Sequence, residues 1–261
     1  MEKTLAAPPE STAAGQPAPA TPAAGPSVQE CPSPNRSAPE KSMYVFLSFA
    51  LVGGFLEAYT YLLHGGVFCN AQTGNLVLLA LRLVQGNFAE AWHYLFSILA
   101  YLAGILLSLV LPVLFRKLRL PLFTAALEMC AFAAIAFIPQ DASDWYTYVS
   151  VSFLCALQYN TFTECRGAKA ATTFCTNNLR QTAVNLFGGV REKDAAKLRK
   201  SGIYALVILC FALGAVAGGL TAEHLGNYSA LLCSAVLLPV FVLLLVHAVR
   251  DGRGKESAPK K

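Results

Sequence analysis

The sequence has few charged residues, and this scarcity excludes several classes of protein. Of its 261 residues, only 13% are Asp, Glu, Lys or Arg, whereas 55% are hydrophobic. Soluble domains contain about 25% charged residues. The apolar residues also fall in long uninterrupted runs, without alternating or heptad patterns. The chain is therefore not an ordinary cytosolic enzyme, a disordered protein or a disulfide-stapled secreted domain, and we interpret it as a polytopic α-helical membrane protein.

Sequence patterns for metal and nucleic-acid binding are also lacking. The eight cysteines form no CxxC pair and have no histidines at metal-ligand spacing. The net charge of +5 comes from short Lys and Arg clusters beside apolar runs, which usually set membrane orientation. We therefore predict no metal site, no cofactor and no nucleic-acid partner. The expected partners are the lipid bilayer and a small polar solute, and the question of a homo-oligomer stays open.

Composition divides the chain into three parts. Residues 1–41 contain nine of the fourteen prolines, among Ala, Ser, Thr and Gly, and have no apolar periodicity. Such a segment cannot bury enough surface to offset its ordering entropy, so it is predicted to be a disordered tail. Residues 42–250 are predicted to form the membrane domain, and 251–261 a basic C-terminal tail.

Six apolar stretches are long enough to cross about 30 Å of hydrocarbon, which takes about 20 helical residues. We predict membrane-spanning helices at residues 44–63, 93–115, 122–139, 145–163, 202–222 and 228–249. Two weaker stretches, 67–84 and 170–190, are only partly apolar and carry Asn, Gln, Thr and one Arg each.

The distribution of basic residues predicts the path of the two weak stretches. Basic clusters occur at 116–119, at 191–200 and after 250, whereas the loops around residues 141–144 and 223–224 lack Lys and Arg. If the basic clusters face the cytoplasm, both termini are cytoplasmic, and each weak stretch enters and leaves on one face. The stretches are then re-entrant or broken segments. The competing topology, with eight full crossings, leaves the 191–200 cluster on the wrong side.

The two halves of the predicted membrane domain resemble each other. Residues 58–61 align with 159–162, 73–76 with 176–179, and 98–101 with 208–211, at offsets of 101, 103 and 110. Three matches in one order indicate two repeats, at about 44–139 and 145–249. Three crossings per repeat make the second inverted, as in many secondary transporters. The predicted fold is an all-α integral membrane protein of six transmembrane helices plus two re-entrant segments, in two inverted repeats.

Two signatures carry a resemblance to a known family. Residues 53–61 (GGFLEAYTY) with 70–75 (NAQTGN), and residues 158–162 (QYNTF) with 171–180 (ATTFCTNNLR), resemble the signatures of the YoaK-like family. This resemblance covers about residues 43–249 and implies a six-span bacterial plasma-membrane protein without an assigned biochemical function.

The sequence departs from the family pattern at two positions. Glu57 stands where many relatives carry Asp, and Asn177 where the family usually has Gly. Since Asn tolerates left-handed backbone better than most residues, we expect a tight chain break to persist there.

Glu57 is the first candidate for a functional residue. A carboxylate inside a membrane span costs about 2.5–3.5 kcal/mol on insertion scales, so it should face the bundle interior or a cavity. It is either a protonatable coupling or solute-binding group, or a structural residue bonded between helices or paired with Arg82 or Arg180. Glu128, in the third span, is a secondary candidate for which a packing role is favoured.

The other candidates are polar residues of the weak stretches and of the span before the second one. They are Asn70, Gln72, Thr73, Asn75, Gln158, Asn160, Thr173, Thr176, Asn178 and Arg180. Free backbone amides at the start of a broken helix, with Asn and Thr side chains, suit a polar or anionic ligand. Alternatively, these groups satisfy one another and the broken backbone.

The small-xxx-small pairs Gly104 with Ser108 and Gly214 with Gly218 are interpreted as sites of close helix packing.

These features favour a secondary transporter or facilitator of a small polar or anionic solute, with Glu57 as a proton-sensitive group and no catalytic residues. One alternative is a non-transporting partner or sensor subunit. A membrane-embedded lipid-modifying enzyme is the weaker alternative, because such chemistry usually needs clustered Asp and His residues or a metal.

Overall fold

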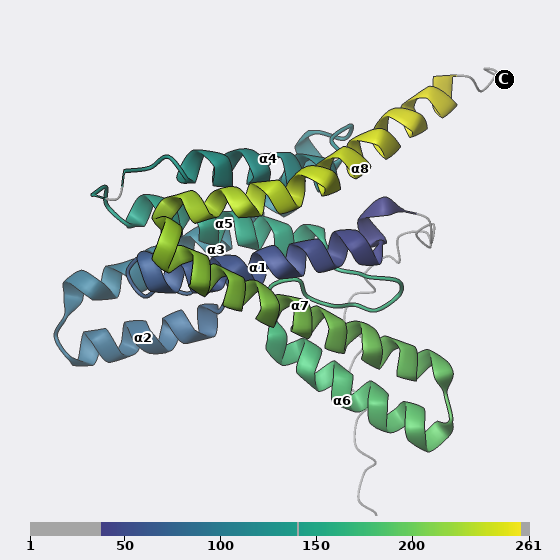
Figure 1. Ribbon diagram of the computed structural model, residues 1–261, viewed down its shortest axis with the longest axis horizontal. Coiled ribbons are helices and arrows are strands. Elements are labelled where there is room, and N and C mark those ends of the chain that lie inside the picture. The colour runs from purple at the N-terminus through teal and green to yellow at the C-terminus, as the bar shows by residue number, and fades with distance from the viewer. Residues whose placement is uncertain (1–37, 140, 257–261) are drawn as a thin grey trace, which may run out of the picture. The chain divides into compact units, whose positions relative to one another are not determined.

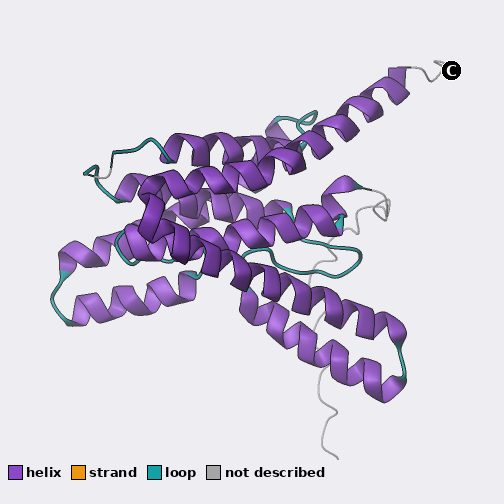
Figure 2. Ribbon diagram, in the orientation of Figure 1, coloured by secondary structure: helices purple, strands orange, loops and turns teal. Residues whose placement is uncertain are grey.

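The computed structural model describes residues 38–139 and 141–256. The predicted tail at 1–41 lies outside the described residues except at its end, where Pro39–Lys41 form a short 3-10 helix, η1. Figure 2 shows that the described residues fold into helices joined by loops, with no strand among them. The all-helical class is thereby confirmed.

Every apolar or weakly apolar stretch of the sequence coincides with a helix. In chain order the helices are α1 (Met43–Leu63), α2 (Gln72–Val84), α3 (Phe88–Leu114), α4 (Leu120–Ile135), α5 (Trp145–Thr161), α6 (Cys175–Glu192), α7 (Ala195–Leu225), the 3-10 helix η2 (Gly226–Ser229) and α8 (Ala230–Glu256). The six predicted crossings correspond to α1, α3, α4, α5, α7 and α8. The two weak stretches correspond to α2 and α6.

Length and hydropathy indicate an integral membrane protein. Among the described residues, three stretches are long and apolar enough to cross a membrane: Met43–Leu63, Phe88–Leu114 and Ala195–Asp251, the last of which contains α7 and α8. Trp92 and Trp145 are exposed and line one apolar groove between α3 and α5. Exposed tryptophans near helix starts are typical of the membrane–water interface.

Helix α2 is too short to cross a bilayer alone. Its 13 residues extend about 20 Å at 1.5 Å per residue, compared with a hydrocarbon thickness of about 30 Å. Helix α6 has 18 residues but is the more polar of the two, with Asn, Gln, Thr and Arg along its length.

Two kinds of helix start occur in this fold. Ser42, Asn87 and Asp194 cap α1, α3 and α7 by accepting hydrogen bonds from backbone amides of the first turn. By contrast, α2 and α6 follow Ala71 and Phe174, whose side chains offer no oxygen to those amides. In the first turn of α2, Gln72 N and Gly74 N donate instead to the carbonyl oxygens of Asn70 and Ala71.

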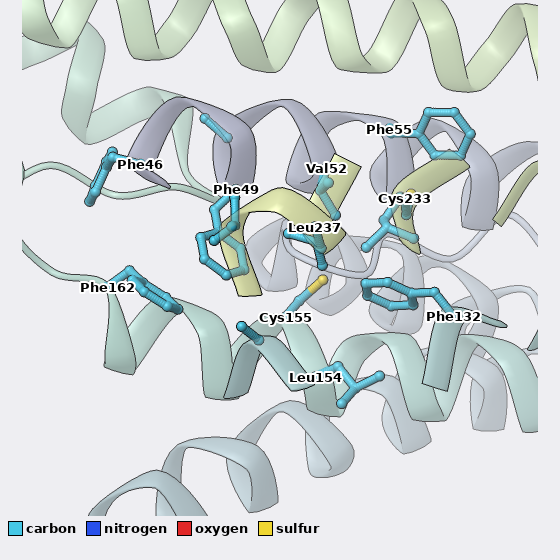
Figure 3. Close-up of a cluster of buried hydrophobic side chains, with 14 of the residues drawn as sticks. Phe46, Phe49, Val52, Phe55, Phe132, Leu154, Cys155, Phe162, Cys233 and Leu237 are labelled. Atoms are coloured by element: carbon cyan, nitrogen blue, oxygen red, sulfur yellow. The ribbon is translucent and has the colours of Figure 1, made fainter. Parts of the chain in front are cut away.

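Helix packing pairs elements of the first half with elements of the second. Helix α1 packs along α7 and α3 along α5, while α4 packs on α8. Helices α2 and α6 lie against α3 and α7, respectively, as Figure 1 shows. Figure 3 shows the apolar core between α1, α4, α5 and α8, where phenylalanines of α1 lie near Phe132, Cys155 and Leu237.

Glycines bring the paired helices into backbone contact. A Cβ on Gly214 of α7 would lie 1.9 Å from the Leu51 carbonyl oxygen of α1, and one on Gly218 would lie 2.5 Å from the Phe55 oxygen. A Cβ on Gly104 of α3 would lie 2.3 Å from the Phe153 oxygen of α5. The prediction of close packing at these small residues is confirmed.

We expect Gly214→Ala to lower the stability of the protein by about 1–3 kcal/mol, because the new methyl group forces α1 and α7 apart. Gly202→Ala on the same helix is the control, since its Cβ would meet no described atom within 4 Å. Thermal unfolding in one detergent tests this, with Gly202→Ala expected to be neutral or stabilising. Equal melting temperatures for the two variants would contradict the packing argument.

Candidate functional site

Helices α2 and α6 both begin in the interior of the helix bundle. The segment before α2 contacts Glu57 in the last third of α1, and the segment before α6 contacts Gln158 near the end of α5. From there, α2 runs outward beside the first part of α3, and α6 beside the first part of α7 (Figure 1). Residues 64–84 are called the first broken segment below, and residues 162–192 the second.

Each broken segment is closed by an asparagine clamp. The Asn75 side chain accepts a hydrogen bond from Phe68 N (3.0 Å) and donates one to Phe68 O (2.6 Å). The Asn178 side chain accepts from Ala171 N (3.1 Å) and donates to Ala171 O (2.7 Å). Both clamps span seven residues, at the positions that the sequence repeat aligns. These predicted site residues therefore fix the backbone ahead of each helix.

Asn177 does not have the left-handed backbone that the sequence led us to expect. Among the described residues, positive φ outside glycine occurs only at Arg166 and Lys193, so Asn177 is not left-handed, and both it and Gly74 lie inside helices. A Cβ on Gly74 would lie 3.0 Å from the Phe68 ring. At the aligned position of Phe68 the second repeat has Ala171, and Asn177 itself is exposed.

Glu57 binds the two backbone amides that immediately precede α2. Its carboxylate accepts hydrogen bonds from Asn70 N (2.8 Å), Ala71 N (3.1 Å) and the Cys69 thiol (3.2 Å). The carboxyl group lies at the N-terminal, positive end of the α2 dipole. Neither arginine pairs with it: Arg82 binds Glu90 (2.9 Å), and Arg180 is exposed on α6. The alternative of a Glu57–arginine pair was therefore wrong.

The aligned position of the second half carries an amide in place of the acid. The Gln158 Nε2 group donates to Thr172 Oγ1 (2.9 Å) and to the Phe49 carbonyl oxygen (3.3 Å). Gln158 Oε1 is buried and has no hydrogen-bond partner among the described residues. Within the same residues, Thr173 N and Phe174 N donate to no protein acceptor, although Asn70 N and Ala71 N, which they align with, both do.

Several of the buried polar atoms without partners lie near the starts of α2 and α6. In the part of the chain that the structure describes, they include Asn70 Oδ1, Tyr101 OH, Gln158 Oε1 and Thr173 Oγ1. The four side chains are at most 6% exposed. With Glu57, Cys69 and Thr172, we call these residues the central polar cluster. A buried polar group without a partner costs about 1–3 kcal/mol, so a group of them calls for an explanation.

Contacts between the two halves hold this cluster together. Asn70 Nδ2 donates to the Gly53 carbonyl oxygen (3.0 Å), and a Cβ on Gly53 would lie 3.0 Å from Thr172 O and 3.6 Å from Thr173 Cγ2. Tyr101 faces Thr173, and its ring packs edge-on against Phe174 at 6.2 Å between centroids. The first segment, the second segment, α1 and α3 therefore meet at one place.

Several predicted site residues lie apart from the central polar cluster. Thr73, Thr176 and Arg180 are exposed on α2 and α6. Asn160 donates to Ser108 Oγ on α3 (2.7 Å), and Gln72 donates to Cys69 O (2.9 Å) as part of the first segment. Glu128 is fully buried in α4, and neither of its carboxylate oxygens has a hydrogen-bond partner among the described residues.

Sequence reasoning missed Tyr101, Thr172 and Cys69. Tyr101 carried a usable signal, because its aligned residue in the second repeat is Phe211, and a hydroxyl added to one copy of an apolar position is unusual. Thr172 and Cys69 carried none, since they enter the cluster only through the fold of the loops.

A second polar hollow lies at one end of the helices. It encloses about 560 Å³ between the ends of α1, α4 and α7, and its lining includes His64, Asp144, Glu223 and Asn227. His64 is 4% exposed, and its Nδ1 atom lies 3.1 Å from Asp144 Oδ1. Burial lowers the pKa of His64 below its ordinary value, and the Asp144 carboxylate only partly offsets this effect.

Replacing Glu57 with Gln should lower the free energy of unfolding by about 1.5–3 kcal/mol, because the Asn70 and Ala71 amides lose a charged acceptor. Glu128→Gln is the matched control, since neither Glu128 oxygen is bonded among the described residues. Chemical unfolding in one detergent measures both. If Glu57→Gln were as stable as Glu128→Gln, the role of Glu57 at these amides would be refuted.

The His64 environment predicts a loss of stability on acidification. Because the folded pKa lies below the unfolded value of about 6.5, the unfolded state takes up the proton first, and stability falls as the pH drops through 6.5. Melting temperatures between pH 7.5 and 5.5 test this. In His64→Gln the fall in melting temperature on acidification should be smaller, because the variant has no imidazole to protonate. A melting temperature of the wild-type protein that rises on acidification would contradict the predicted loss of stability.

Comparison with known proteins gives a family and no function. No curated protein and no solved structure matches the chain. The family described as "Protein of unknown function (DUF1275)" matches residues 45–244, which include both asparagine clamps and the central polar cluster. The expected resemblance to the YoaK-like proteins is thereby confirmed. This chain belongs to the DUF1275 family of membrane proteins of unknown function.

Proposed function

We propose that this protein is a secondary transporter or facilitator that binds a small polar or anionic solute at the central polar cluster. The observation that carries the proposal is the group of four buried polar atoms that lack partners among the described residues, where two interrupted helices begin. A purely structural break would pair these atoms, because hydrocarbon offers no alternative partner. A solute that pairs them is the explanation that we favour.

An inverted-repeat topology is part of the proposal. The equivalent clamps at Asn75 and Asn178, and the packing of α1 on α7 and α3 on α5, support two copies of one unit. In this arrangement α2 and α6 are re-entrant, and α1, α3, α4, α5, α7 and α8 cross the membrane. Interrupted helices near the bilayer midplane are where many secondary transporters bind their solutes. Rocking of the two units then exposes the cluster to each side in turn.

Glu57 is the proposed site of proton coupling. Protonation would replace its charge-assisted hydrogen bonds to Asn70 N and Ala71 N with weaker neutral ones. The start of α2 would then be free to shift relative to α1, so a proton on Glu57 biases the position of the first broken segment. We place the protein in the bacterial plasma membrane with both termini cytoplasmic, which follows the basic clusters of the sequence.

We expect purified protein in liposomes to take up at least one member of a panel of radiolabelled lactate, succinate, glycine, glycerol and urea. Uptake should rise when the outside is acidified, and Glu57→Gln should lose this acceleration while Glu128→Gln keeps it. Empty liposomes provide the background rate.

Two outcomes would contradict the proposal. Uptake equal to that of empty liposomes for every solute would favour the alternative of a non-transporting partner or sensor subunit. Uptake with an unchanged pH response in Glu57→Gln would keep a transporter and remove Glu57 from the coupling step.

A further inference from the structure

We infer that the solute is a small carboxylate with a hydroxyl or ammonium group, and that its carboxylate binds the start of α6 as Glu57 binds the start of α2. This inference rests on the proposed function and specifies the ligand of the same site. It follows from comparing the two broken segments residue by residue.

The two segments have the same local fold. The clamps join Phe68 to Asn75 and Ala171 to Asn178 through the same pair of hydrogen bonds. This register aligns Asn70 with Thr173 and Ala71 with Phe174. In the first segment these two amides are occupied by a carboxylate of the chain itself. In the second, within the residues that the structure describes, they donate to no protein group.

The start of α2 therefore has a carboxylate partner that the start of α6 lacks. Position 158 holds a glutamine whose Nε2 donates to Thr172 and Phe49, and whose acceptor, Oε1, receives no hydrogen bond from the α6 amides. The 18-residue helix α6 presents its positive end to this place, and a helix N-terminus favours an anion. The hydroxyls of Tyr101 and Thr173 face each other and are both more than nine-tenths buried, so one donates to the other and one proton is left for a ligand.

The other two unpartnered atoms specify the rest of the ligand. Asn70 Oδ1 and Gln158 Oε1 are acceptors only, and neither receives a hydrogen bond from the described residues. A bare carboxylate would leave both unpaired. A ligand with a hydroxyl or ammonium group beside its carboxylate can pair them, which gives the site a donor side and an acceptor side.

Four three-carbon probes separate these contributions: L-lactate, L-alanine, propionate and lactamide. The melting temperature of the wild-type protein should rise with lactate or alanine, less with propionate, which lacks the donor, and not with lactamide, which lacks the charge. Lactate and alanine together distinguish a hydroxyl from an ammonium donor. A response to lactamide equal to that of the carboxylates would overturn the inference.

The decisive variant is Gln158→Glu, which places a second carboxylate of the chain beside the α6 amides. It should fold, keep or raise the melting temperature without ligand, and lose the response to carboxylates. Tyr101→Phe should weaken carboxylate binding by about tenfold, whereas Tyr148→Phe, another buried tyrosine whose hydroxyl is unpartnered among the described residues, should bind as the wild type does. An undiminished response in Gln158→Glu, or in Tyr101→Phe if the former does not fold, would refute the site.

Uptake into liposomes distinguishes failure of this inference from failure of the proposed function. Transport of glycerol or urea without any response to carboxylates would refute the carboxylate site and leave a transporter. Absence of both transport and binding for all probes would refute the two proposals together.

Discussion

The carboxylate of Glu57 binds the two backbone amides that immediately precede α2, and the arrangement of the first half depends on this interaction. Without it, Asn70 N and Ala71 N would be buried donors at the start of a helix that follows alanine. Two backbone amides, a thiol and the N-terminal end of α2 surround the carboxyl group inside the helix bundle. A single acidic side chain in α1 thus holds the chain where α2 begins.

The two halves have the same backbone conformation before α2 and α6, but they differ in the groups that bind the backbone amides there. Asn75 and Asn178 hold the chain in the same way before α2 and α6. The first half then satisfies its amides internally through Glu57, whereas Gln158 leaves the second half with unpaired donors and acceptors within the described residues. Both proposals depend on this difference between the two halves.

The sequence was sufficient to predict the helices, because long apolar runs have few alternatives to helical structure in a bilayer. The repeat alignment also matched Asn75 with Asn178, since register follows directly from sequence spacing. The expectation of left-handed backbone at Asn177 was wrong, because this residue lies inside α6. Exposure of Thr73, Thr176 and Arg180 was equally hidden, since polar residues on a short helix point in all directions and only packing decides which are enclosed.

The missed residues show where sequence reasoning ends. His64 and Asp144 are eighty positions apart, and their contact requires the ends of α1 and α5 to be adjacent. Tyr101 joins the cluster because α3 packs on α5 and faces the loop before α6. Contacts of this kind depend on how the helices of the two halves pack. The sequence indicated this packing only through the small residues at the contact points.

In the proposed topology, the two interrupted helices α2 and α6 enter the protein from opposite faces of the membrane and meet inside it. Labelling of single-cysteine variants with a membrane-impermeant maleimide tests this most directly, in a background without the native cysteines. If α2 and α6 are re-entrant, Gln85→Cys should be labelled from the same side as Tyr228→Cys, and Lys193→Cys from the same side as Lys117→Cys, with the two pairs on opposite sides. Labelling of Gln85 and Tyr228 from opposite sides, or of Lys117 and Lys193 from opposite sides, would mean that these helices cross the membrane and would contradict the account.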